Sequence, residues 1–173
     1  WNGENYPFEA WNADQTLQSA MTSSVNWYFQ SIDEQLASTN IYNYIQQIGY
    51  GNENVSGDLS TYWLESSLKI SPVEQVELLM KLQNNSLGFS SENINAVKDS
   101  ICLSSSNTGK FYGKTGTGRV GGQDVNGWFI GYIEIVNNIY FFATNIGADN
   151  NATGSNAAEI TMSILSDMNI WTQ

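Results

Sequence analysis

Residues 111–118 read Phe-Tyr-Gly-Lys-Thr-Gly-Thr-Gly, which sets a lysine and two threonine hydroxyls among glycines. The aromatic pair at the start favours a β-strand, whereas Gly116 and Gly118 remove side-chain bulk on both sides of Thr117. A strand with so little bulk lets another molecule approach its backbone amides closely. We therefore predict that this stretch is a strand lining a binding cleft, with Lys114 supplying a positive charge.

The same region is a positive island in an acidic chain. No acidic residue lies between Asp99 and Asp124, but three of the six basic residues do: Lys110, Lys114 and Arg119. Such a patch favours an anionic ligand, because strand amides flanked by glycine can donate hydrogen bonds to an oxyanion or carboxylate. The alternative is a glycine-rich hairpin with solvated lysines. A phosphate-binding loop fits poorly, since Thr108 stands where that motif requires its first glycine.

Composition excludes several classes of protein. A chain of 173 residues suits one domain, and its net charge of −11 argues against nucleic acid and anionic membranes as partners. No apolar run is long enough to cross a bilayer. The lack of histidine excludes a Ser-His-Asp triad and a histidine-containing zinc site, so catalysis would have to use Lys, Ser, Tyr or carboxylates. Cys102, the single cysteine, has apolar neighbours, which favours a buried structural thiol over a nucleophile.

Helical spacing of apolar residues dominates the first part of the chain. We expect a helix capped by Asp14 that ends near residue 23, a second helix over residues 27–36, and a third over residues 40–48 that stops at Gly49. Ser24, Val25 and Asn26 then fall at a junction between helices, where side chains can point into a cleft.

Two further helix starts are indicated by capping residues. Ser71-Pro72-Val73-Glu74 combines a capping box with proline at the first helical position. Ser91 is expected to cap the next helix, after which the pattern changes to strand. Residues 50–60 are expected to be a loop.

The last part of the chain predicts a sheet and a closing helix. Two β-rich runs, Trp128–Val136 and Ile139–Ile146, are joined at Asn137-Asn138, which suits a type I′ turn. After a polar loop, an apolar stripe over residues 157–168 predicts a helix. Helices before a sheet and one after it favour an α+β fold, in which helices cover both faces of an antiparallel sheet.

Two short motifs carry the chemistry when they are taken together. Ser24-x-Asn26 and Lys114-Thr115-Gly116 pair a serine with a lysine, and a lysine beside a hydroxyl can relay a proton without histidine. In this order, they resemble the second and third motifs of the penicillin-recognising serine acyltransferases, which include penicillin-binding proteins and serine β-lactamases. That resemblance implies the same α+β fold.

The resemblance extends over most of the chain. It is similar to the class D β-lactamases at residues 11–17, 50–52, 63–65, 70–76 and 127–132. Two stretches look more like the sensor domains of BlaR/MecR-type β-lactam receptors, namely residues 24–29 and 140–146. Class D enzymes usually carry valine where Asn26 stands. We therefore expect a β-lactam sensor that signals induction of resistance, with a class D β-lactamase as the alternative.

The resemblance implies roles for the two catalytic candidates, Ser24 and Lys114. Ser24 would pass a proton to the departing lactam nitrogen, and Lys114 would hold Ser24 and the ligand carboxylate in a positive field. The amide of Thr117 would form half of the oxyanion hole.

Ligand binding is implied for the neighbouring positions. The hydroxyl of Thr115 or Thr117 would bind the ligand carboxylate, and Gly116 would keep the strand free of bulk. Asn26 would bind either the acylamide side chain or the lysine of the first motif. Trp63 would form a wall of the pocket near that lysine, and the alternative for Trp63 is core packing.

The family's first motif, Ser-x-x-Lys, has no counterpart before Ser24. The only such string is Ser66-Ser67-Leu68-Lys69, which follows the second motif instead of preceding it. We therefore expect residues 1–173 to be the C-terminal part of a penicillin-binding domain whose nucleophile lies upstream of Trp1. The expected partners are β-lactams, that upstream segment and a membrane domain of the same protein, at the extracellular face of a bacterial membrane or secreted. The only modification implied is a carbamylated lysine upstream.

A carbohydrate-binding or glycoside-acting module is a different class of hypothesis. The chain has many aromatics and seventeen acidic residues that can supply a carboxylate pair. No such pair stands out by its context. Loss of ligand binding on changing an acidic pair, with Lys114→Ala harmless, would favour this class.

Overall fold

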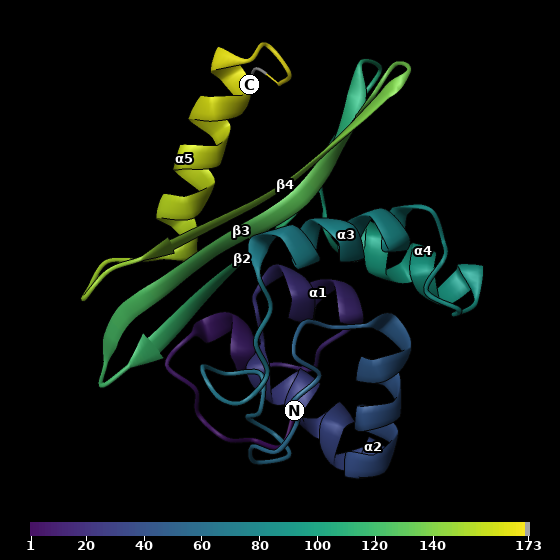
Figure 1. Ribbon diagram of the computed structural model, residues 1–173. Coiled ribbons are helices and arrows are strands. Elements are labelled where there is room, and N and C mark those ends of the chain that lie inside the picture. The colour runs from purple at the N-terminus through teal and green to yellow at the C-terminus, as the bar shows by residue number, and fades with distance from the viewer. Residues whose placement is uncertain (172–173) are drawn as a thin grey trace.

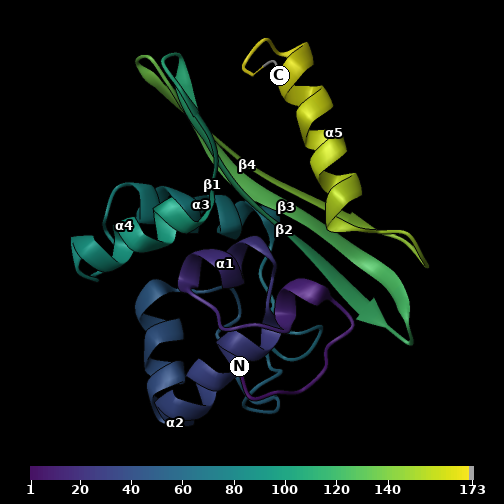
Figure 2. The same cartoon turned by 180° about the vertical axis from the view of Figure 1, so that it is seen from behind.

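A four-stranded antiparallel sheet, in the order β1-β2-β3-β4, lies at the centre of the computed structural model, which describes residues 1–171. The strands are β1 (Cys102–Ser106), β2 (Gly109–Val120), β3 (Gln123–Ile135) and β4 (Asn138–Gly147). Helix α5 (Gly154–Asp167) packs on one face of the sheet, and α3 (Pro72–Gln83) lies on the other face (Figures 1 and 2). The expected α+β fold with helices on both faces is confirmed.

The remaining helices lie on the α3 side of the sheet: α1 (Leu17–Thr22), α2 (Asn26–Ile48) and α4 (Ser91–Ser100). A short 3-10 helix, η1 (Glu9–Trp11), precedes α1 in the chain. The two helices expected over residues 27–36 and 40–48 are both present within α2. They are separated at Ala37, whose backbone is not helical (φ 61°, ψ 152°). Gly49 ends α2 in the left-handed region, as the sequence predicts.

The capping box of α3 forms as predicted. Ser71 Oγ accepts a hydrogen bond from the Glu74 amide at 3.3 Å, and the Glu74 carboxylate accepts one from the Ser71 amide at 2.8 Å. These contacts satisfy two of the backbone groups that a helix start leaves unpaired. The strongest local signal in the sequence therefore gives the expected helix start.

Two other caps differ from prediction. Helix α1 is capped by Thr16, whose hydroxyl accepts from the Ser19 amide at 3.2 Å, while Ser19 Oγ accepts from the Thr16 amide at 2.9 Å. Asp14 lies too far upstream to bond those first amides. Helix α4 is capped by Ser90 instead of Ser91, because the side chain of Ser90 reaches the amide three residues on.

The turn between β3 and β4 is not the expected type I′ turn. Ile135 pairs with Asn138, so the two turn residues are Val136 and Asn137. A type I′ turn requires positive φ at both residues, but only Asn137 has it, at 69°. A β-branched valine resists that region, and this explains the different turn.

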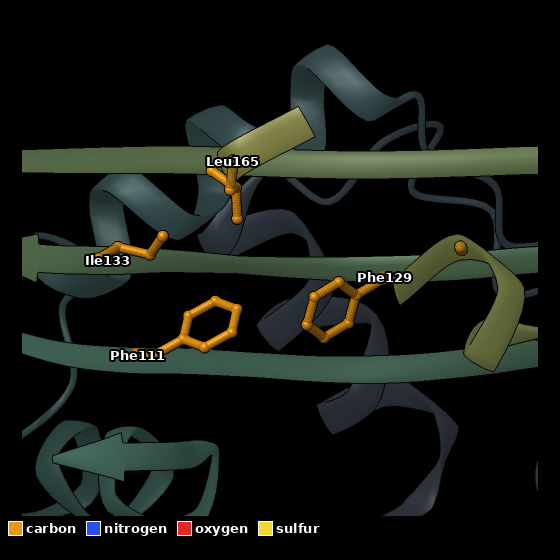
Figure 3. Packing of buried hydrophobic residues seen from close by; sticks show 5 residues of the cluster. Phe111, Phe129, Ile133 and Leu165 are labelled. Atoms are coloured by element: carbon orange, nitrogen blue, oxygen red, sulfur yellow. The ribbon is translucent and has the colours of Figure 1, made fainter. Parts of the chain in front are cut away.

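The two aromatic residues that begin the central stretch support opposite faces of the sheet. Phe111 packs with Phe129, Ile133 and Leu165 between the sheet and α5 (Figure 3). Tyr112 faces the other way, into a second cluster formed with Leu79, Ile101 and Tyr132. Cys102 packs against this cluster but is only half-buried, so the thiol is less buried than the sequence predicts. Both clusters fix β2 firmly up to Tyr112.

Candidate functional site

The Ser24 side chain is presented by the junction between α1 and α2. Val25 donates its amide hydrogen to Ala20 O at 2.9 Å, and Ser24 donates to Met21 O at 3.3 Å, which is the Schellman pattern of a helix end. Ser24 takes the left-handed position, with φ 50°. That conformation costs a non-glycine residue about 1–2 kcal/mol. The buried Val25 anchors the turn, and the exposed Ser24 is left at the surface.

Two tryptophans hold this junction in place. Trp11 Nε1 donates to Ser23 O at 3.0 Å, and Trp27 Nε1 donates to Trp11 O at 3.0 Å. The ring of Tyr6 stacks on Trp27 with centroids 6.2 Å apart. The segment that carries Ser24 is thus fixed from both sides. In the sequence Trp11 stands out only through the family resemblance, because its indole partner is a backbone oxygen that no sequence pattern reveals.

The edge of β2 becomes open where the candidate motif begins. Pairing with β1 ends at Tyr112, and the next amide, of Gly113, donates to Ile101 O at 2.8 Å. Backbone amides alternate in direction along a strand, so those of Thr115 and Thr117 point to the same side. Among the described residues, no strand pairs with this edge of β2 after Tyr112, and both threonines are exposed. Two amides therefore face outward next to Lys114.

Lys114 joins the two motifs. Its Nζ donates to Ser24 Oγ at 2.5 Å and to Thr115 O at 2.6 Å. Burial lowers the pKa of the Lys114 amine from its ordinary value, because removal from water disfavours the ammonium form. A lysine with a lowered pKa, bonded to a serine hydroxyl, is suited to exchange a proton with it. The pairing of Ser24 with Lys114, across 90 residues, needs no histidine.

The positive island is smaller than the sequence suggests. Arg119 Nε lies 2.7 Å from Asp124 Oδ1, so its charge is compensated by the acidic residue that ends the basic stretch. Lys110 is exposed and sits opposite Glu134 in the β2–β3 register. Of the three cations, Lys114 is the one bonded to the Ser24 hydroxyl. The β2–β3 register, which the linear order of residues does not reveal, brings Asp124 close to Arg119 and Glu134 opposite Lys110.

Helix α5 supports the back of the same stretch. The Gly154 amide donates to Thr117 Oγ1 at 2.9 Å, and a Cβ at Gly154 would lie only 2.9 Å from Thr115 Cβ. The first residue of α5 thus packs directly against β2, and a helix start carries a partial positive charge. Gly154 is expected in a loop from the sequence, but it is the first residue of α5, and Thr153, a typical N-cap residue, marks the helix start.

Asn26, Gly116 and Trp63 are the remaining predicted site residues. Asn26 is the first residue of α2 and is half-buried. A Cβ added at Gly116 would meet nothing closer than Trp128 Cβ at 3.8 Å, so this position is open. Trp63 Nε1 donates to Asp33 Oδ2 at 2.9 Å, and burial raises the pKa of the Asp33 carboxyl. Trp63 is thus half-buried and bonded to α2, and its role as a pocket wall stays a prediction.

Comparisons with known proteins agree with the expected resemblance. Residues 1–166 match the model of the penicillin binding protein transpeptidase domain. The chain is 47% identical to the regulatory protein BlaR1 of Bacillus licheniformis over 99% of its own length, which is 28% of that protein. It is 43% identical to the methicillin resistance mecR1 protein of Staphylococcus aureus, and it spans 29% of that relative.

Solved structures give the same result. The C-terminal domain of the Bacillus licheniformis BlaR penicillin-receptor is 46% identical with a TM-score of 0.94, and the match covers 99% of this chain and 70% of that one. A class D β-lactamase from Bacillus subtilis is 36% identical with a TM-score of 0.91, covering 100% and 70% of the two chains. The chain therefore belongs to the penicillin-binding protein transpeptidase domain family, in the group of BlaR-type receptor domains and class D β-lactamases.

Proposed function

We propose that this chain is the β-lactam-binding part of a BlaR/MecR-type sensor. In this proposal penicillins or cephalosporins acylate the domain, and the stable acyl ester signals induction of resistance. The observation that carries the proposal is the Lys114–Ser24 hydrogen bond at the point where β2 loses its neighbour. The likeness to BlaR and MecR relatives supports it, although the chain spans less than a third of those proteins.

The chemistry assigns a proton path to the two joined side chains. The serine of the upstream Ser-x-x-Lys motif gives its hydroxyl proton to the lysine of that motif as its oxygen attacks the lactam carbonyl, and the Thr117 amide donates to the oxyanion that forms. The lactam C–N bond then breaks. Its nitrogen takes a proton from Ser24 Oγ, and the Lys114 ammonium replaces that proton. The product is an ester between the nucleophilic serine and the opened lactam.

We place the nucleophile in a segment before Trp1. Ser-x-x-Lys works when a helical turn brings serine and lysine to one face. Residues 66–69 form bends and irregular chain, Ser67 Oγ donates to Asn54 O at 2.8 Å, and Lys69 pairs with Glu65. This local string therefore lacks the required geometry. The chain spans 70% of the solved BlaR domain, and the proposal assigns the first motif to the remaining part.

We also infer a location and partners for the domain. The sensor domain would lie at the extracellular face of a bacterial membrane, held by a membrane domain of the same protein, with secretion as the alternative. No helix among residues 1–171 is long and apolar enough to cross a membrane. The ligand of the proposed sensor domain is a β-lactam. We propose no metal or organic cofactor; a carbamylated lysine upstream belongs only to the hydrolase alternative.

Covalent labelling tests this function. The extended protein, meaning this chain together with its upstream segment, should form an adduct with a fluorescent penicillin. Residues 1–173 alone should not. Intact mass spectrometry and peptide mapping locate the adduct. Labelling of Ser66 in the short chain would show that the nucleophile lies inside it, and an unlabelled extended protein would contradict the proposal.

Asn26 separates a sensor from a hydrolase. A class D enzyme hydrolyses its acyl ester with a carbamylated lysine as base, and carbamylation requires a neutral amine, which an apolar pocket favours. Valine at position 26 would form such an apolar wall. The carboxamide of Asn26 instead offers a hydrogen-bond partner to the lysine amine and competes with the carbamate. Without that base, water is not activated and the ester persists.

Turnover kinetics test this distinction. The extended protein should release one equivalent of product from a chromogenic cephalosporin in a burst and then turn over during hours. Asn26→Val should raise the slow rate, and Asn26→Gln, which keeps the carboxamide, is the matched control. Rapid multiple turnover by the unmodified protein would establish the class D β-lactamase alternative instead.

A further inference from the structure

The Glu65 side chain covers part of the candidate binding strand. It extends from the loop between α2 and α3 and lies over Gly118, where an added Cβ would be 2.7 Å from Glu65 Cγ. The Glu65 backbone is left-handed, with φ 44°. Only 25% of its side chain is exposed. A carboxylate is therefore held against β2, two residues beyond the open position Gly116.

A chain of hydrogen bonds fixes this carboxylate. Asn126, the cross-strand partner of Gly118, donates its Nδ2 hydrogen to Glu65 Oε1 at 2.8 Å. Asn145 on β4 donates in turn to Asn126 Oδ1 at 2.7 Å. The nearest cation, Lys69, lies 3.8 Å from Glu65 Oε2 and is 58% exposed, so water screens most of its effect. Glu65 is thus positioned by β3 and β4, and no cation among residues 1–171 lies closer to its carboxylate than the exposed Lys69.

Glu65 and Lys114 lie on the same face of β2. Side chains alternate along a strand, so Lys114, Gly116 and Gly118 share one face. Four residues of strand place the Cα atoms of Lys114 and Gly118, the glycine that Glu65 covers, about 13 Å apart. Between them, Gly116 is open. A ligand lying along this edge therefore meets a cation at one end and a fixed carboxylate at the other.

We propose that Glu65 is a specificity-determining residue for the acyl side chain of the β-lactam. This inference rests on the proposed function, in which the ligand carboxylate lies near Lys114. The acyl side chain then extends toward Gly118 and Glu65. An ammonium group on that side chain is attracted by Glu65, whereas a second carboxylate is repelled. The domain therefore prefers penicillins with a cationic side chain to dianionic ones.

Acylation rates measure the preference. Second-order rate constants are compared in the extended protein for ampicillin, benzylpenicillin and carbenicillin, whose side chains carry an ammonium, no charge and a carboxylate. Ampicillin should exceed carbenicillin about tenfold, as expected for one partly screened charge contact. Glu65→Gln keeps the hydrogen bond from Asn126 and should reduce the ratio to about twofold or less, with benzylpenicillin changed less than threefold.

Two controls make the result specific. Glu159→Gln removes the same charge from an exposed position on α5, across the sheet, and should leave the ratio unchanged. In the unmodified protein, raising the salt concentration should shrink the ratio, because ions screen a charge contact. A ratio that is unchanged in Glu65→Gln or insensitive to salt overturns this inference alone. Failure of all three penicillins to acylate the protein overturns the proposed function as well.

Discussion

Residues 109–112 of β2 pair with a strand on each side, whereas residues 114–120 pair with β3 alone. In the first part Phe111 and Tyr112 are buried on opposite faces. In the second part Thr115, Gly116 and Thr117 are exposed. The same strand is therefore a core element over residues 109–112, called here its buried half, and an open edge over residues 114–120, its exposed half, where we propose that the ligand binds.

This difference explains how a rigid site is built at an exposed edge. Bonds to β3 continue along the whole of β2, and α5 supports it from behind through Gly154. The amides at the open edge are thus held in position without a partner of their own. Preorganised donors of this kind need little rearrangement when negative charge develops on a ligand. Substitutions in the two halves should consequently affect different properties.

The largest expected effect is on stability, in the buried half. Phe111→Ala removes a ring that packs with Phe129, Ile133 and Leu165, and it should lower the free energy of unfolding by about 3–5 kcal/mol. Thr115→Ala, in the exposed half, should change it by less than about 0.5 kcal/mol. Urea unfolding of the extended protein measures both. Equal losses would show that the two halves are equally part of the core.

The sequence predicts the buried half of β2 and two of the helix ends correctly. The aromatic pair at 111 and 112, the capping box at Ser71 and the glycine stop at Gly49 are local signals, and local physics decides them. The same holds for the fold class. Other local predictions are wrong. Thr16 caps α1 in place of Asp14. In the β3–β4 turn, Val136 does not adopt the positive φ that a type I′ turn requires.

The second largest effect is expected on acylation. Lys114→Ala removes the amine that bonds Ser24 Oγ, and it should slow acylation by about a hundredfold, which corresponds to about 2.7 kcal/mol of activation free energy. Lys110→Ala, an exposed lysine of the same strand, is the matched control. Stopped-flow labelling with a fluorescent penicillin gives the rates, and circular dichroism checks that both variants fold. Unchanged acylation in Lys114→Ala would remove it from the mechanism.

The candidate site was only partly predictable. Two short motifs predict Ser24 and Lys114 as site residues, and the structure brings them into contact. The contacts of Glu65, Trp11 and Asp124 were not anticipated, because each depends on loop or hairpin geometry between distant parts of the chain. Contacts between side chains from distant parts of the chain produce no pattern in the spacing of residues, so the sequence does not predict them.

Two glycines of β2 provide an intermediate test. A Cβ at Gly113 would lie 2.8 Å from the ring of Phe129, so Gly113→Ala should cost about 1–3 kcal/mol of stability through overpacking. Gly116→Ala meets no atom closer than 3.8 Å and should leave stability nearly unchanged. In the proposed binding mode its methyl group lies on the ligand side, so acylation should fall by about tenfold through misplacement of the ligand. Normal acylation in a folded Gly116→Ala protein would move the ligand away from this edge.

The smallest effect concerns Thr117, whose amide and hydroxyl point in different directions. Thr117 Oγ1 accepts the Gly154 amide hydrogen, so Thr117→Val, which keeps the shape but loses the acceptor, should lower stability by about 1 kcal/mol. The backbone amide proposed for the oxyanion remains, and the acylation rate should change less than about threefold because that donor is intact. Thr117→Ser keeps the acceptor and should preserve both properties. Thermal unfolding and acylation kinetics of the three proteins separate the two roles. A large loss of acylation with full stability in Thr117→Val would instead assign the hydroxyl to the ligand carboxylate.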